Sequence, residues 1–79
     1  GSAATEAVPI LVSNLRHENH WVRRACAKAL GKIGSPQAVD PLRGALSDQN
    51  RFVAHSAANA LRKIGTRQAL AALKGYRGI

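Results

Sequence analysis

The sequence predicts an all-α protein, a right-handed α-solenoid of helix pairs with two full repeats and one further helix. Three observations predict this fold class. The chain repeats itself without a gap, its apolar residues recur three and four positions apart, and helix-capping residues bound the predicted helices. Because 79 residues suffice for one small domain, residues 3–79 are expected to form a single unit.

The repeat is visible when residues 7–37 are laid over residues 38–68. A partial third copy occupies residues 69–79 and keeps Leu73. Identity at a fixed spacing is the signature of stacked repeats, and the identical positions are expected to form the core. They are Ala7/Ala38, Val8/Val39, Leu11/Leu42, Leu15/Leu46, Asn19/Asn50, Val22/Val53, Ala27/Ala58, Ala29/Ala60, Leu30/Leu61, Lys32/Lys63, Ile33/Ile64, Gly34/Gly65 and Gln37/Gln68.

The first helix of each repeat is expected near residues 5–16 and 36–47, where apolar residues follow one helical face. Thr5 and Ser35 are plausible start signals, because their hydroxyl groups can accept from free backbone N–H groups. Pro36 suits the first turn, where its missing N–H costs nothing. Pro41 lies deeper and removes one intrahelical bond, so it is expected to bend that helix or delay its start.

The second helix of each repeat is expected at residues 20–33 and 51–64. Asn19 and Asn50 can cap the starts, and Gly34 and Gly65 can adopt the left-handed conformation that ends a helix. An inward stripe with many small residues predicts close helix packing. The stripe consists of Val22, Ala25, Cys26, Ala29, Leu30 and Ile33 in the first copy, and Val53, Ser56, Ala57, Ala60, Leu61 and Ile64 in the second.

Composition indicates where the segment comes from and in which compartment it is expected. Residues 1–2, Gly-Ser, look like the remnant of a cleaved tag, and with no Met the segment is expected to be excised from a longer protein. No apolar run approaches the roughly 18–20 residues that span a bilayer, so no membrane segment is expected. The single cysteine cannot form an internal disulfide, which favours a reducing, cytoplasmic setting.

No residue pattern predicts catalysis, a cofactor or a metal ion. His17 and His20 straddle the Asn19 cap instead of sharing a helical face, and no Cys or carboxylate completes a tetrahedral set. Cys26 falls on the inward stripe without a His three or four residues away to activate it. The four carboxylates are scattered and suit helix starts better than paired acid–base chemistry. The chain is therefore predicted not to be an enzyme.

The residue pattern resembles a known family. Ala38-Val39-Asp40-Pro41-Leu42, Val22-Arg23-Arg24-Ala25 and the run Ala29 to Gly34 are similar to the short HEAT-like repeats first noted in phycobilisome lyase subunits. The resemblance implies stacked helix pairs that serve as a binding scaffold. It also places Arg23 where it could bind Glu18 in the preceding loop, a contact that Ala54 removes from the second copy.

The positions that differ between the two copies, together with Lys32 and Lys63 one turn further along, form a second face on the second helices, which line the concave side of such a solenoid. This face combines cations with two aromatic residues, a composition typical of contact sites, since Trp and Arg are favoured anchors. The candidate binding residues are His20, Trp21, Arg24, Lys28, Lys32, Arg51, Phe52, His55, Asn59 and Lys63.

A structural role competes with this interpretation, because the aromatic rings could cover the edge of a thin core and the lysines could be a solvated face. Among partners, a net charge of +8 favours acidic ones. The partner expected first is an acidic protein segment or other repeats of the parent chain. Nucleic acid is the alternative, with phosphates neutralised by Arg and Lys and a base stacked on Trp21. The family resemblance adds a bilin, whose propionates need cations and whose rings need aromatics.

Overall fold

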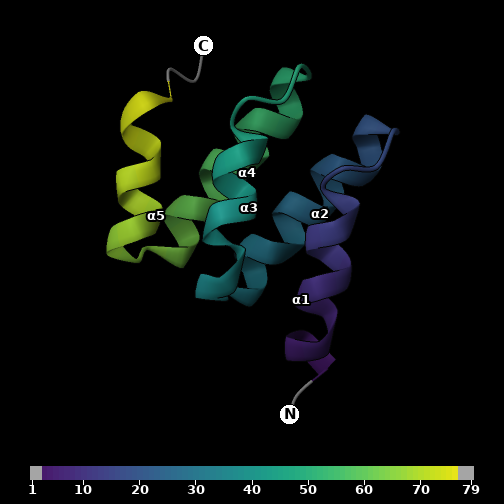
Figure 1. Ribbon diagram of the computed structural model, residues 1–79, viewed down its shortest axis with the longest axis horizontal. Coiled ribbons are helices and arrows are strands. Elements are labelled where there is room, and N and C mark those ends of the chain that lie inside the picture. Colours follow the sequence, from purple (N-terminus) through teal and green to yellow (C-terminus); the bar gives the residue numbers. More distant parts are fainter. Residues whose placement is uncertain (1–2, 77–79) are drawn as a thin grey trace.

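The computed structural model describes residues 3–76. Within this range the chain consists of helices and the turns and loops that connect them, without strands. Figure 1 shows the order of the elements along the chain. The helices are α1 (Ala3–Asn14), α2 (His20–Ile33), α3 (Val39–Ala45), α4 (Arg51–Ile64) and α5 (Arg67–Ala72), with short 3₁₀ turns η1 (Pro36–Ala38) and η2 (Leu73–Gly75).

The helices form two layers. α1, α3 and α5 lie side by side in one layer, and α2 and α4 form the layer behind them (Figure 1). Each repeat pairs a helix of the front layer with one of the back layer, as α1 pairs with α2 and α3 with α4. The most extensive interface joins α2 to α4, so the back layer carries the main joint between repeats. The prediction of an all-α solenoid with two helix pairs and one further helix is confirmed.

The back-layer helices have the predicted bounds, because their start and stop signals are local. Asn19 Oδ1 accepts from the Trp21 N–H at 2.8 Å. Asn50 Oδ1 accepts from the N–H groups of Phe52 and Val53 at 2.9 and 3.2 Å. Gly34 and Gly65 end these helices with φ of 74° and 69°, in the left-handed region that other residues rarely adopt.

The front-layer helices differ from the expected ranges. α1 begins at Ala3 and ends at Asn14, so Thr5 lies inside the helix and does not start it. In the second repeat Ser35 starts only the turn η1, where its Oγ accepts from the Gln37 N–H at 3.3 Å. The α-helix itself begins at Val39, as the position of Pro41 suggests, because Pro41 has no N–H to bond back to residue 37.

The core lies between the two layers and is built from small and aliphatic side chains. Leu30, Leu42, Val53 and Leu61 are the largest fully buried side chains. Ala25 was predicted on the inward stripe, but it is exposed, whereas its equivalent in the second repeat, Ser56, is buried. Identity between copies is also not a sure sign of burial, since Lys32, Lys63, Gln37 and Gln68 are all exposed.

Candidate functional site

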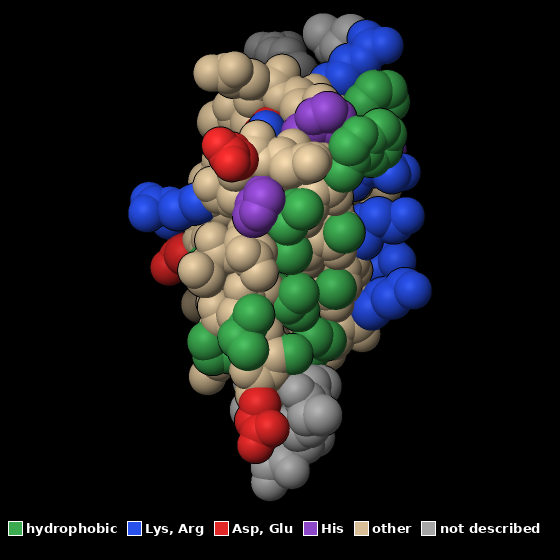
Figure 2. Space-filling view, turned by 90° about the vertical axis from the view of Figure 1, so that its right-hand side faces the viewer, with side chains coloured by type: hydrophobic (Ala, Val, Ile, Leu, Met, Phe, Trp, Pro, Cys, Tyr) green, Lys and Arg blue, Asp and Glu red, His purple; other side chains and the backbone are tan. Residues whose placement is uncertain are grey.

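The candidate residues lie on the back layer, on the surface of α2 and α4 that points away from α1 and α3; we call it the α2–α4 face. His20 and Arg24 are half-buried, and the other eight candidates are exposed. Figure 2 shows most of the visible Lys and Arg side chains gathered along one edge of the molecule, the edge that the back layer forms. The acidic side chains visible in that view lie away from this edge (Figure 2).

A shallow groove of about 350 Å³ runs between α2 and α4 on this face, and its lining is basic and polar. Cations line it from both helices, and no carboxylate is among its lining residues. Its lining comprises Arg24, Lys28, Phe52, His55, Ser56, Asn59, Ala60, Arg62 and Lys63. Such a groove attracts anions, because nothing in its walls neutralises the positive charge.

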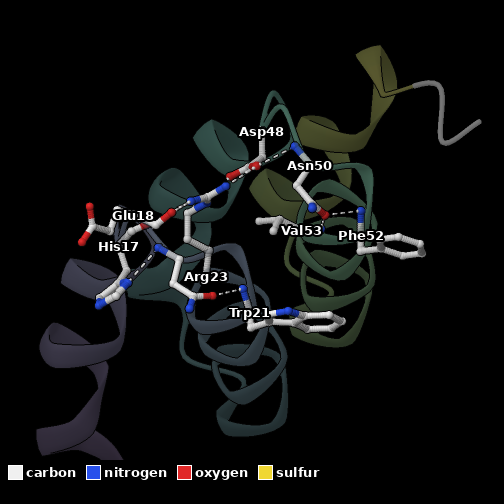
Figure 3. Close-up of polar contacts among 9 residues, drawn as sticks. His17, Glu18, Trp21, Arg23, Asp48, Asn50, Phe52 and Val53 are labelled. Atoms are coloured by element: carbon white, nitrogen blue, oxygen red, sulfur yellow. Dashed lines mark hydrogen bonds and ion pairs between the residues drawn. The ribbon is translucent and has the colours of Figure 1, made fainter.

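Two aromatic side chains occupy equivalent positions at the starts of α2 and α4. Trp21 is 61% exposed and Phe52 is 56% exposed, so both rings keep most of their surface in contact with water. The cap hydrogen bonds of Asn19 and Asn50 hold the two helix starts, and in Figure 3 the rings project toward the same side. Trp is a favoured anchor at binding interfaces, so a partner could bury these two rings.

An arginine accompanies each ring. The guanidinium carbon of Arg24 lies 5.8 Å from the centre of the Trp21 ring, and that of Arg51 lies 5.7 Å from the Phe52 ring. Both distances are within the range of cation–π attraction, which orients a guanidinium without neutralising it. The His20 ring also lies 4.9 Å from the Trp21 ring, in a tilted arrangement.

The structure brings together only part of the predicted set. Arg24, Lys28, Phe52, His55, Asn59 and Lys63 share the groove. His20, Trp21 and Arg51 belong to the helix starts beside it, and Lys32 is exposed but is not part of the lining.

Sequence reasoning missed Arg62. This residue lines the groove and donates from Nη1 to Asn59 Oδ1 at 2.8 Å, which directs the amide of Asn59 as well. The signal that could have found it was its replacement of a glycine, since Gly31 stands at the same position of the first repeat. At this position the first repeat has a glycine without a side chain, and the second repeat has a positively charged arginine.

Arg23 binds the preceding loop as predicted, but its carboxylate partner is not the predicted one. Its Nη1 group donates to the backbone carbonyls of His17 and Glu18, at 2.7 and 3.1 Å, and not to the Glu18 carboxylate. Its Nε and Nη2 groups instead bind the carboxylate of Asp48, at 2.8 and 3.1 Å (Figure 3). Arg23 is therefore committed to the joint between repeats and is not a free cation of the α2–α4 face.

Asp48 is held in its ionised form by this contact. Burial alone would raise the pKa of Asp48, but the hydrogen bond from Arg23, the N–H of Asn50 at 2.9 Å and the positive charge of Arg23 outweigh it. The net result is a pKa below the ordinary value of an aspartate. A planar guanidinium that grips both carboxylate oxygens is the strong form of such a pair.

The chemistry available elsewhere is limited. Cys26 is buried, and burial raises the pKa of its thiol, which disfavours the reactive thiolate. Among residues 3–76, no group of three or more His, Cys, Asp and Glu side chains is arranged to hold a metal ion. In the same range, no helix has the length and apolar character needed to cross a membrane.

Comparison with known protein families identifies the kind of repeat that the chain contains. A family described as HEAT repeats matches residues 8–77, nearly the whole chain. The protein therefore belongs to the HEAT-repeat family, whose members generally act as scaffolds for protein interactions and are typically not enzymes. None of the curated proteins matches the chain.

Proposed function

We propose that this protein is a non-catalytic interaction module that binds an acidic segment of a protein partner across the α2–α4 face. The groove between α2 and α4 is the observation that carries the proposal, because cations from both helices line it and no carboxylate does. A carboxylate-rich segment would find complementary charge there, which favours encounter and selects against basic partners.

The two aromatic rings supply the other half of the argument. Trp21 and Phe52 stand exposed at one end of the face, next to the guanidinium groups of Arg24 and Arg51. Burial of such rings under an apolar side chain of the partner would provide affinity that salt does not screen. The expected ligand therefore combines acidic residues with at least one apolar side chain.

Nucleic acid is the second candidate, and the exposed Trp21 ring favours it, because a base can stack on it. Arg23, one of the arginines that could contact phosphate, is already engaged, since it pairs with Asp48. The resemblance to repeats of phycobilisome lyase subunits keeps a bilin as a third ligand to test. The groove is shallow and open to solvent, which suits an extended chain better than a planar pigment that needs enclosure.

A titration with three ligands tests the proposal. An acidic peptide containing one leucine, a short oligonucleotide and a bilin are each added, and binding is followed by calorimetry and Trp21 fluorescence. We expect the peptide to bind, with a fluorescence shift as the indole loses water. A steep linear fall of log affinity with log salt, and a preference for the oligonucleotide, would instead indicate phosphate recognition.

Variants assign the site. Trp21→Ala combined with Lys28→Glu is expected to weaken peptide binding by at least about tenfold, since both side chains are exposed on the face. Arg16→Glu is the matched control, because Arg16 is exposed in the turn that follows α1, is not a candidate residue of the face, and its reversal changes net charge equally. If the Arg16 variant loses as much affinity as the double variant, the binding reflects overall charge and the proposed site is wrong.

A further inference from the structure

Two contacts build the joint between the first and second repeats. One is the pair of hydrogen bonds from Arg23 in α2 to the carboxylate of Asp48 in the loop before α4. The other is a close approach of the two helices at Gly31, where an added Cβ would lie 2.8 Å from Ala60 Cα and 2.9 Å from Ala60 Cβ. Position 31 must therefore be glycine for α4 to lie this near to α2, because no rotamer moves a Cβ away.

Neither contact is available on the far side of the second repeat. Ala54 stands where Arg23 stands in the first repeat, so a following loop would find no guanidinium. Arg62 stands where Gly31 stands, and it is exposed. A further back-layer helix that approached α4 as closely as α4 approaches α2 would collide with the Cβ of Arg62.

The side of α2 that faces away from α4 keeps the small residues found at the contact between α2 and α4. Ala25 and Ala29 in α2 match Ser56 and Ala60 in α4, and Ser56 and Ala60 are buried. The side of α2 away from α4 thus keeps small residues at the positions that face α2 in the second repeat. Positions 54 and 62 of α4 are the equivalents of the α2 positions that meet the next repeat, and from position 62 the arginine side chain, which binds Asn59, also reaches the groove.

We infer that α4 is the last helix of the back layer's regular stack, and that its outward side does not accept another HEAT repeat in the same register. Arg62 does not pack against a neighbouring helix as Gly31 does, and its side chain lines the groove. The consequence for the ligand rests on the proposed function. The two helices of the α2–α4 face, about 10 Å apart, together span about 20 Å. An extended segment of about six residues covers that span, so the part of the partner that crosses these two helices is a short acidic stretch.

The inference is tested by lengthening the stack inside the full chain. A second copy of residues 38–68 is inserted between Gln68 and Ala69, which supplies a copy of Asp48 and a copy of Ala60 for a new joint. The original sequence is compared with a version in which the first copy of repeat two carries Ala54→Arg and Arg62→Gly. Both proteins are unfolded by urea and by heat.

With Ala54 and Arg62 retained, we expect two unfolding steps, the inserted repeat melting before the rest. With both substitutions, we expect one step and a steeper dependence on urea, since more surface unfolds together. A single cooperative step with Ala54 and Arg62 in place would overturn the inference. Two steps in the substituted protein would overturn it equally, because those two residues would then not control the joint.

Peptide binding separates this inference from the proposed function. The substituted protein, with three stacked back-layer helices, is expected to bind a twelve-residue acidic peptide more tightly than a six-residue one. The natural chain is expected to bind both about equally at high salt. If no chain binds either peptide, the proposed function is wrong, while the unfolding result still decides where the stack ends. If the natural chain gains affinity from the longer peptide as the substituted protein does, the two-helix width is wrong.

Discussion

Arg23 in α2 holds Asp48 of the next repeat through two hydrogen bonds, from Nε to Oδ2 at 2.8 Å and from Nη2 to Oδ1 at 3.1 Å. The same guanidinium also donates to the carbonyl groups of His17 and Glu18. One side chain therefore ties the loop before its own helix to the loop before the neighbouring one. Both partners are largely buried, so this pair is worth more than an exposed one.

Removal of either partner is expected to destabilise the domain. Arg23→Gln and Asp48→Asn should each lower the free energy of unfolding by about 1.5–3 kcal/mol, the range for hydrogen bonds to charged groups. In a double-mutant cycle the combined loss should be smaller than the sum, because the second substitution finds the contact already broken. Urea denaturation followed by circular dichroism measures all four proteins.

The pair of Asp40 and Arg43 is the control for that cycle. These groups lie 3.0 Å apart but are well exposed. Asp40→Asn should therefore change the free energy of unfolding by no more than about 0.5 kcal/mol. A loss as large as that of Asp48→Asn would mean that net charge, and not the joint between repeats, determines the effect.

The joint should also make stability depend on pH in acid. Because the pKa of Asp48 is lowered in the folded protein, the unfolded state takes up its proton first as the pH falls, near the ordinary Asp value of about 3.9. The contribution of Asp48 is thus complete above that pH and is lost as the pH falls through the folded value. Urea midpoints measured from neutral pH into this acid range should fall less in Asp48→Asn than in the original protein. Equal slopes in the two proteins would contradict the role given to Asp48.

Two glycines should respond oppositely to alanine. At Gly31 the new methyl group would meet the backbone of Ala60, so Gly31→Ala should cost about 1–3 kcal/mol as the helices are forced apart. At Gly44, in α3, an added Cβ meets nothing within 4 Å. Gly44→Ala should therefore leave stability unchanged or raise it by about 0.5–1 kcal/mol, through better helix propensity. Thermal unfolding of the two variants side by side measures the difference.

The start of α4 should depend on its cap. Asn50→Ala removes the acceptor used by the N–H groups of Phe52 and Val53, and a loss of about 1 kcal/mol is expected. Asn50→Asp keeps an oxygen at the same place and should retain most of the stability. Asn59→Ala, in the exposed middle of α4, is the matched substitution without a cap and should have little effect. Thermal unfolding midpoints of the three variants distinguish a capping role from a general loss of amide groups.

Local signals in the sequence determined the helical fold and the bounds of α2 and α4. An asparagine cap and a terminal glycine act within one turn of the residues that they affect, so they can be recognised without knowledge of the fold. The repeat itself indicated that the helices stack in pairs. The same repeat placed Trp21 and Phe52 at equivalent positions, which is why the aromatic pair could be predicted as part of one face.

The sequence predicted most of the inward stripe of α2 and α4, but only the tertiary structure decided which residues make the contacts between repeats. Arg23 was expected to bind Glu18, five residues earlier. It does reach the Glu18 carbonyl, but its carboxylate partner is Asp48, which only the stacking of repeats brings near. Ala25 was expected in the core, but it is exposed. The equivalent positions Gly31 and Arg62 also have different surroundings, which only the tertiary structure decides. One faces the neighbouring helix at contact distance and the other faces the open groove, and such distances between helices are not encoded in any single segment of the chain.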